Sequence, residues 1–529
     1  MSGAHARPRG APGQALAVPD HRRARTRQRC ALAVVAGAVF MAMLDNLALN
    51  NALPHIGAEM GLGISGLQWV VAGYTLVFAA FLLSGSVLGD RFGQRRTFLA
   101  GVLAFCAGSA AGALAPDWTW LLAGRLVQGA GAAALMPAGM GLLRHAFPDG
   151  ARRTRAMGVR GGAGGLGVAL GPTIGGPLVD ALGWRSVLWI NLPVGAAMVL
   201  LGLRALPRVP CAPARWDPAG QLLAVVGLGS LVYGLVQAPV DGWTAPGVLA
   251  TLATAAVALP AFAAAEWYAA APMLDVRLLR DRGTAAACLA LFAASLGLFG
   301  GVFFLTLYLQ DVLGWSAAGA GAVFLTASGV IVPAAPAAGL LCARRGARLP
   351  LLCGLALCAV ALAGLARYGR GAAYAGYGWL LPVLGAGVGL TFVTAVIAAV
   401  QRAPAERTAM TSALMDTLRE LGGVVGVAVL GAVLAGRMRS ALVTYATAEG
   451  VPQQAARDLA ASVLRHGPAA SLGQAATAPG AARQAPVWAE RAFVDGLGPA
   501  LLCGAGCIAA AALAVALLLR RDRAPLPGG

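Results

Sequence analysis

The sequence predicts an all-α integral membrane protein with about fourteen transmembrane helices, and three observations lead to this fold class. The chain of 529 residues is 58% hydrophobic and only 12% charged, whereas soluble domains carry about a quarter charged residues. Apolar runs recur along the chain, each close to the ~20 residues that cross a bilayer as a helix. The net charge of +19 comes from arginine alone, mostly in the short segments between these runs, which is typical of cytoplasmic loops.

The apolar runs define where each transmembrane helix is expected to begin. Five arginines between Arg22 and Arg29 precede the first run, as in a signal peptide, but this run continues past Asp45 to about Leu53. It is too long for a cleaved segment, so we expect an uncleaved first span. The spans are predicted to start near residues 31, 67, 97, 119, 156, 186, 218, 246, 284, 317, 350, 376, 410 and 494.

The arginines also predict the orientation. With the N-terminus in the cytoplasm, the short outside loops hold only Arg185, Arg367 and Arg370. Apart from Arg125 and Arg419, which lie within spans, the other arginines outside the long segment 437–492 fall in cytoplasmic segments. This is the asymmetry expected of a membrane protein, because positive charge is retained inside. An even number of spans then places both termini in the cytoplasm.

A sequence pattern that occurs twice predicts how the spans are grouped. Segments Ser86–Arg95 and Gly339–Arg348 follow the second and tenth spans and share the spacing of one glycine and two arginines. Parallel repeats of six helices, with two extra helices between them, account for this spacing. The expected parts are a disordered basic cytoplasmic tail (1–29), an N-terminal six-helix bundle (30–206), two inserted transmembrane helices (207–270), a C-terminal six-helix bundle (271–520) with an extracellular loop (437–492), and a cytoplasmic tail (521–529).

Within the predicted extracellular loop, Val451–Arg465 has the apolar spacing of an amphipathic helix. Such a helix could cap the outer mouth of the protein, or it could belong to a solvated loop with no role in transport.

Composition and motifs exclude several classes of protein. The nine cysteines and five histidines have no zinc or haem spacing, so neither a metal nor a cofactor is expected. No nucleotide-binding loop and no G-x-S-x-G pattern is present, which argues against an enzyme. Because the arginines lie between apolar runs, the basic charge indicates a membrane protein and not one that binds nucleic acid.

A glycine-rich stretch, Gly158–Gly176, lies in the predicted fifth span. At about 100° per residue, several of its glycines fall on one helix face, where another backbone can pack closely, and a proline distorts the helix. This face could be a generic packing surface, but the pattern is narrower than that. Its fixed positions are Gly158, Gly167, Gly171, Pro172, Gly175 and Gly176.

Polar residues inside two further spans are candidates for function. The first span carries Asp45 with Asn46 and Asn50, and an apolar helix with such groups must face water, a substrate or a polar partner. The fourth span carries Arg125 with Gln128 three residues later, on the same face. Arg125 could instead extend its charge to the membrane interface. A carboxyl group removed from water can exchange protons near neutral pH, so Asp45 is the first candidate for proton coupling.

The predicted thirteenth span carries Asp416, Arg419 and Glu420, which share one helix face. Either acid could bind a proton or a cationic substrate. Alternatively, the three residues could neutralise one another around Arg419.

These strings resemble the major facilitator superfamily, and in particular its fourteen-span drug:proton antiporter branch. The glycine-rich stretch is similar to the antiporter motif, and Leu44–Pro54 is similar to the span-one motif. Gly183–Gly195 and Tyr308–Ser316 resemble two further strings of the branch. The turn after the second span resembles the signature G-x-L-x-D-R-x-G-R-R, with Ser86 and Gln94 as departures, and matches it at Asp90, Arg91, Gly93 and Arg95.

The resemblance implies a major facilitator fold and proton-coupled export of drugs or antibiotics by alternating access. It implies that Arg125 takes part in proton transfer, and that Asp90 and its basic neighbours hold the cytoplasmic side closed. The expected partners are protons, the lipid bilayer and a small drug-like substrate, hydrophobic or cationic. The expected setting is a bacterial plasma membrane, with the chain as a monomer. The alternatives are a specific metabolite exporter or importer of the same fold, and a membrane receptor that transports nothing.

Overall fold

The computed structural model describes residues 21–209, 211, 217–269, 272, 274, 276–367, 369, 374–403, 408–470 and 479–520, and these form helices and their connections. The helices, in chain order, are α1 (His21–Met60), α2 (Ile64–Phe92), α3 (Gln94–Ala113), α4 (Trp118–Ala146), α5 (Gly150–Leu182), α6 (Arg185–Trp189), α7 (Asn191–Ala205), α8 (Pro218–Asp241), α9 (Pro246–Tyr268), η1 (Val276–Arg280), α10 (Arg282–Leu307), η2 (Tyr308–Val312), α11 (Ala317–Arg345), α12 (Arg348–Leu365), α13 (Tyr374–Tyr377), α14 (Leu380–Arg402), α15 (Thr408–Ala448), α16 (Gln453–Ala470) and α17 (Pro479–Arg520).

Within the described residues, 14 helical segments are long and apolar enough to cross a membrane, which confirms the predicted fold class. Two predicted boundaries are wrong. Residues 21–29 continue α1 as a helix, whereas the sequence predicted a disordered tail there; residues 1–20 and 521–529 lie outside the described part. The predicted loop 437–492 is shorter than expected, because α15 extends to Ala448 and α17 begins at Pro479. The amphipathic helix predicted at 451–465 is confirmed as α16.

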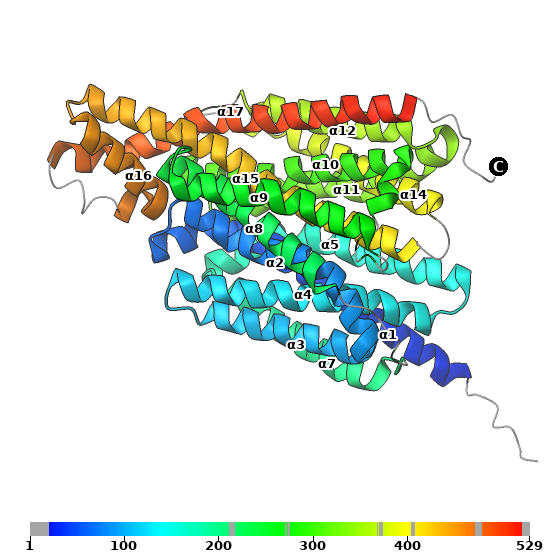
Figure 1. Cartoon of the computed structure of the whole chain (residues 1–529). Coiled ribbons are helices and arrows are strands. Elements are labelled where there is room, and N and C mark those ends of the chain that lie inside the picture. The colour runs from blue at the N-terminus through cyan, green and yellow to red at the C-terminus, as the bar shows by residue number, and fades with distance from the viewer. Residues whose placement is uncertain are drawn as a thin grey trace, which may run out of the picture.

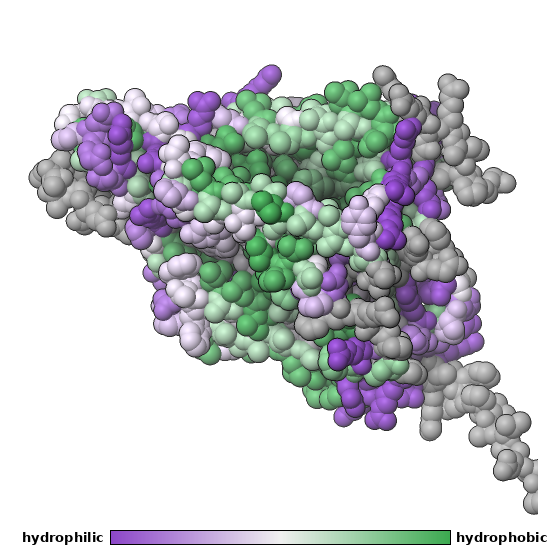
Figure 2. Space-filling view, in the orientation of Figure 1, coloured by the Kyte–Doolittle hydropathy of each residue, from purple (hydrophilic) through white to green (hydrophobic). Residues whose placement is uncertain are grey.

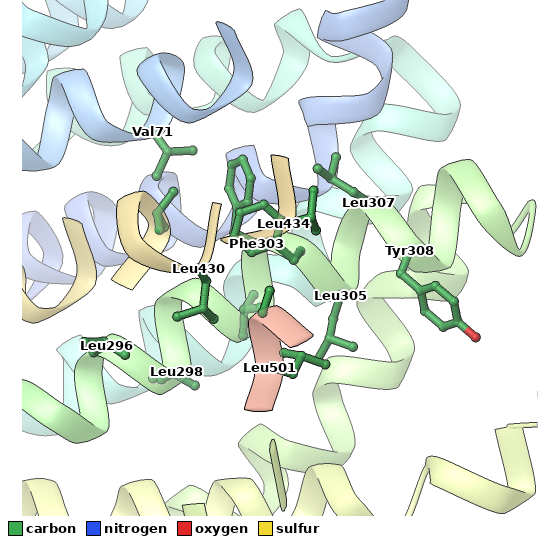
Figure 3. Packing of buried hydrophobic residues seen from close by; sticks show 14 of the residues in the cluster. Val71, Leu296, Leu298, Phe303, Leu305, Leu307, Tyr308, Leu430, Leu434 and Leu501 are labelled. Carbon is green, nitrogen blue, oxygen red and sulfur yellow. The ribbon is translucent and has the colours of Figure 1, made fainter. Parts of the chain in front are cut away.

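The helices lie side by side and most run the length of the molecule (Figure 1). In the first half of the molecule (α1–α7), α1 packs against α5 and α7, and α3 packs against α4. The second half comprises α10–α17. In the second half α10 is the central helix, with almost every side chain buried. Figure 3 shows Phe303 of α10 near Leu430 and Leu434 of α15 and Leu501 of α17, within one cluster of buried hydrophobic residues. Helices α8 and α9 pack against each other, and α8 also contacts α2 and α15.

The two ends of the molecule differ in character. Helix α1 begins and α17 ends at the same end, and α16 lies at the opposite one (Figure 1). Since consecutive spans run antiparallel, the connections after α2, α4, α7, α9 and α11 lie at the first end, and arginine occurs in each of them or in the adjoining helix ends. We call these the arginine-rich end and the α16 end. Figure 2 shows hydrophobic residues over the middle of the molecule and hydrophilic residues gathered toward its ends, as a membrane-spanning protein requires.

The two halves are joined near the α16 end. The carboxylate of Asp180, in α5, accepts hydrogen bonds from the backbone N–H groups of Ala317 (3.1 Å) and Ala318 (2.9 Å), at the start of α11. The side-chain amide of Gln68, in α2, donates to the carbonyl oxygen of Val427, in α15, at 2.8 Å. Toward the arginine-rich end, by contrast, a Cβ atom added at Gly158 of α5 or at Gly329 of α11 would have no heavy atom within 4 Å. The hydrogen bonds given between the two halves therefore gather near the α16 end.

Helix α16 covers the α16 end. It is inserted between two helices of the second half, but it binds the turn between α1 and α2. The backbone N–H of Gly63 donates to the carbonyl oxygen of Arg465 at 2.9 Å, and the Ser65 hydroxyl donates to the carbonyl oxygen of Leu464 at 3.2 Å. Arg465 also pairs with Asp241 at the end of α8. These contacts place α16 across the halves.

Candidate functional site

The centre of the site is an ion pair between Asp45 of α1 and Arg125 of α4. The Nη1 atom of Arg125 lies 2.6 Å from Oδ2 of Asp45, and both side chains are fully buried. Two charges removed from water at this distance attract strongly, but each is costly if the other is lost. The pair brings together two residues that the sequence singled out separately, 80 positions apart.

Neutral polar groups surround this pair and fix its geometry. Oδ1 of Asp45 accepts from the amide of Asn191, at the start of α7, at 2.6 Å, and from that of Gln128 at 3.2 Å. The carbonyl group of Gln128 in turn accepts from Arg125 at 2.8 Å. Asn191 also donates to the hydroxyl of Ser109, in α3, at 2.9 Å. Residues of α4 and α7 thus hold the Asp45 carboxylate together, and α3 supports Asn191 through Ser109.

The remaining face of the arginine lies against an aromatic ring. The guanidinium carbon of Arg125 is 4.5 Å from the ring centroid of Tyr74, in α2, and its Nε donates to the carbonyl oxygen of Val70 at 3.3 Å. A cation over an aromatic face is stabilised by the ring quadrupole. The Nη2 atom of Arg125 is buried and has no hydrogen-bond partner among the described residues. Its N–H groups can therefore donate to a new acceptor if the ion pair rearranges.

Three members of this network escaped the sequence analysis. Asn191 was noticed only within a string that carried the resemblance, while Ser109 and Tyr74 were not singled out. The available signal was an asparagine at the start of an apolar helix, which must find a partner when it is buried.

Asn46 and Asn50 do not bind Asp45 but line a small cavity between the two halves. A volume of about 10 Å³, roughly the room of one water molecule, is bounded by α1, α2, α10 and α15. Oδ1 of Asn50 is buried there with no hydrogen-bond partner among the described residues. The lining residues are Asn46, Asn50, Val71, Ala72, Thr75, Phe299, Glu420, Gly423, Val424 and Val427.

The triad on α15 forms a second charged group. Nη2 of Arg419 donates to Glu420 at 2.8 Å, and Nη1 of Arg419 lies 3.6 Å from Asp416. The Glu420 side chain is only 2% exposed, whereas that of Asp416 is 34% exposed. The predicted self-neutralising arrangement around Arg419 is therefore present, and Glu420 also reaches the cavity between the halves. The structure leaves Asp45 and Glu420 in separate networks.

The glycines of the antiporter-like stretch lie where two helices press on α5. A Cβ atom added at Gly167, Gly171 or Gly175 would lie 2.7–2.9 Å from atoms of α1. One added at Gly176 would lie 2.4 Å from the carbonyl oxygen of Ala317, at the start of α11. The stretch therefore packs against both halves, while Gly158 has open space beside it. The amide of Asn51, in α1, completes this junction by donating to the carbonyl oxygens of Pro172 (2.9 Å) and Ala317 (3.3 Å).

The charged turn after α2 lies at the arginine-rich end. Gln94 donates to Asp90 at 2.7 Å, and Arg95 donates to the carbonyl oxygen of Leu203 in α7. Gly93 has a φ of +92°, a conformation that favours glycine. Arg91 lies over the ring of Phe92. The hydrogen bonds given for Asp90 and Arg95 lie within the first half.

Comparison with known proteins identifies the family. The sequence profile of the Major Facilitator Superfamily matches residues 35–427. The chain is 36% identical to "Multidrug resistance protein Stp" of Mycobacterium tuberculosis over 91% of this chain and 89% of that protein. It is 34% identical to "Tetracenomycin C resistance and export protein" of Streptomyces glaucescens, over 93% of each chain.

A solved structure supports the fold independently. A bacterial homologue of the human lysosomal transporter Spinster, in an inward-facing and unoccupied conformation, superposes with a TM-score of 0.64 at 16% identity, over 95% of this chain and 99% of that one. Sequence and fold agree, and the chain belongs to the Major Facilitator Superfamily, as a multi-pass membrane transporter and not an enzyme.

Proposed function

We propose that this chain, as a monomer in the plasma membrane of a bacterial cell, exports drugs or antibiotics in exchange for protons. Its relatives support the export of such molecules, because two of them are named for multidrug resistance and for tetracenomycin C resistance and export. The arginine-rich end is then the cytoplasmic face. The tight packing at the α16 end corresponds to a state closed toward the outside.

The observation that carries the proton coupling is the fully buried Asp45–Arg125 pair. Protonation of Asp45 removes its negative charge, so Arg125 loses its counter-ion while it remains buried. The donors from Asn191 and Gln128 then face a neutral acid, to which hydrogen bonds are weaker. Protonation therefore changes the relative free energy of the arrangement that joins α1, α4 and α7.

Helix α1 can transmit this change to the junction between the halves. It carries Asp45, and about two turns further on it carries Asn51, which bonds both α5 and α11. A shift of α1 that relaxes the neutralised pair also displaces Asn51 from the carbonyl oxygens of Pro172 and Ala317. The bare glycine face of α5 lets α1 slide without clashing side chains. We propose that this couples protonation to opening at the α16 end.

Glu420 provides a second acidic group at the cavity between the halves. Its carboxylate is paired with Arg419, so a cationic group or a proton must compete with that arginine. Asn46 and Asn50, in α1, line the same cavity and can donate to or accept from a bound molecule. We propose that the substrate binds here once the cavity widens, and that Asp45 couples the proton beside it.

A susceptibility and accumulation panel in a pump-deficient bacterial host tests this function. Expression of the chain is expected to lower the accumulation of some drugs, and a protonophore is expected to abolish the effect. Asp149→Asn, which changes an exposed carboxylate at the arginine-rich end, serves as a control and should behave as wild type. Export of a single compound class would favour a specific metabolite exporter. No change for any compound would favour a receptor.

A further inference from the structure

Arg160 is a membrane-embedded arginine that the Asp45 network does not use. It was predicted in a cytoplasmic segment, but it lies about ten residues after the start of α5 and five residues inside the membrane-spanning segment Arg155–Leu182, roughly 7.5 Å along the helix axis. Charged residues at such a depth are costly and usually face a cavity or a partner. Its position therefore calls for a ligand or a counter-ion.

The contacts of Arg160 differ from those of the two other arginines at the centre of the molecule. Arg125 and Arg419 each bind a carboxylate, at 2.6 Å and 2.8 Å. The hydrogen bond given for Arg160 runs from Nη2 to the thioether of Met136, in α4, at 3.7 Å, and a thioether is a weak acceptor. Its Nε atom is buried with no hydrogen-bond partner among the described residues. Within the described part of the chain, no carboxylate is given within ion-pair distance of Arg160.

Arg160 also faces the other half of the molecule. Asp416 and Arg419, in α15, lie close enough to interact with it electrostatically. Asp416 is about eight residues from the start of α15, so the two residues lie at similar depths from the arginine-rich end. On the other faces of α5 at this level, a Cβ atom added at Gly161, Gly162 or Gly165 would have no heavy atom within 4 Å.

The pairing of the charged residues on α15 leaves the guanidinium of Arg160 available to bind an anion. Asp416 and Glu420 both interact with Arg419, which partly neutralises them. A guanidinium presents a planar fork of N–H groups that matches a carboxylate in two parallel hydrogen bonds. A phenolate can accept from the same fork. A ligand anion that enters from the arginine-rich end would therefore accept hydrogen bonds from the N–H groups of Arg160 that Met136 does not satisfy.

We propose that Arg160 binds an anionic group, a carboxylate or phenolate, of the transported molecule. This inference rests on the proposed function and specifies its substrate class. Where the same molecule carries a cationic group, the acids Asp416 and Glu420 lie on the facing helix. The preferred substrates are therefore acidic or zwitterionic drugs, and a purely cationic drug lacks this contact.

Matched pairs of acids and methyl esters test the proposal, for example a carboxy-rhodamine and its methyl ester together with a set of carboxylate antibiotics. Binding to the purified full-length protein is measured by fluorescence or by displacement. Wild type is expected to prefer the acid by about 10–100-fold, the usual value of a hydrogen bond to a charged group. Arg160→Gln should bring the ratio to about one, and Arg160→Lys should keep part of it. Arg155→Gln, an exposed arginine of the same helix, should keep the wild-type ratio.

Three outcomes would overturn the proposal. One is a wild type that binds acids no better than esters, and another is an unchanged ratio in a folded Arg160→Gln variant. The third is an equal loss of both ligands in Arg160→Asp that is restored by the added change Asp416→Arg, since Arg160 would then be an ion-pair partner between the halves. A wild type that exports esters under a proton gradient but shows no preference for acids contradicts this inference alone. A wild type that exports nothing contradicts the proposed function.

Discussion

Replacing one partner of the buried Asp45–Arg125 pair is expected to destabilise the protein far more than replacing one partner of an exposed pair of the same length. The chain offers this comparison directly. Arg125 and Asp45 are 2.6 Å apart with both side chains fully buried, and Arg185 and Glu59 are also 2.6 Å apart, with side chains 37% and 49% exposed. Distance is therefore held constant, and burial is the variable.

The expected magnitudes follow from what each change leaves behind. Arg125→Met leaves a buried carboxylate with only the amides of Asn191 and Gln128, at a cost of about 3–5 kcal/mol. This corresponds to a factor of roughly 150–4,000 in the folding equilibrium. Arg185→Met removes an exposed pair, which is usually worth about 0–1 kcal/mol. The double variant Asp45→Leu with Arg125→Met removes both charges and should recover most of the stability, while transport stays absent.

Unfolding in mixed detergent micelles, followed by tryptophan fluorescence, measures these differences as a double-mutant cycle for each pair. We expect a coupling energy of at least about 2 kcal/mol for the buried pair and less than about 1 kcal/mol for the exposed one. Equal stability losses for Arg125→Met and Arg185→Met would refute the reasoning. A double variant no more stable than Arg125→Met alone would do the same.

Three further changes test the packing at the junction and at the α16 end. Gly171→Leu should abolish drug resistance, because its Cβ atom would lie 2.9 Å from α1, whereas Gly158→Ala, with open space beside it, should keep resistance; equal resistance at equal expression would contradict this. Gly63→Leu should displace α16, since a Cβ atom there lies 2.3 Å from the carbonyl oxygen of Leu464, and hydrogen exchange of α16 amides should become faster; unchanged exchange would argue against the contact. Asp180→Ala removes both acceptors at the start of α11, so spin-label distances across the α16 end should show more of the open population, and an unaltered distribution would count against this junction.

The sequence predicted the membrane-spanning elements well because their signal is local. An apolar run of sufficient length forms a helix in a bilayer whatever it packs against, so the number of spans agrees with the described helices. The errors fall where that signal is weak. Residues 21–29 are rich in arginine and resemble a solvated tail, yet they continue a helix that is already formed. In the same way, the last residues of α15 and the first residues of α17 continue helices beyond the apolar runs, into the predicted loop.

The candidate site was predicted in its residues but not in its geometry. The cost of burying Asp45 and Arg125 singled both out, but nothing local indicates that two residues 80 positions apart form a pair. Asn46 was grouped with Asp45 because it is adjacent, although neighbouring residues in a helix point about 100° apart, and it lines the cavity instead. Asn191 was missed because the groups that it binds, Asp45 and Ser109, come from other helices.

We propose that protonation of Asp45 drives exchange, and Asp45→Asn tests this coupling most directly. This variant keeps the size of the side chain and mimics its neutral form. In proteoliposomes with an imposed proton gradient, wild type is expected to accumulate a drug against its concentration gradient. Asp45→Asn is expected to lose this accumulation while it still allows downhill movement or binding of the drug. Gradient-driven accumulation at the wild-type rate in Asp45→Asn would contradict the account.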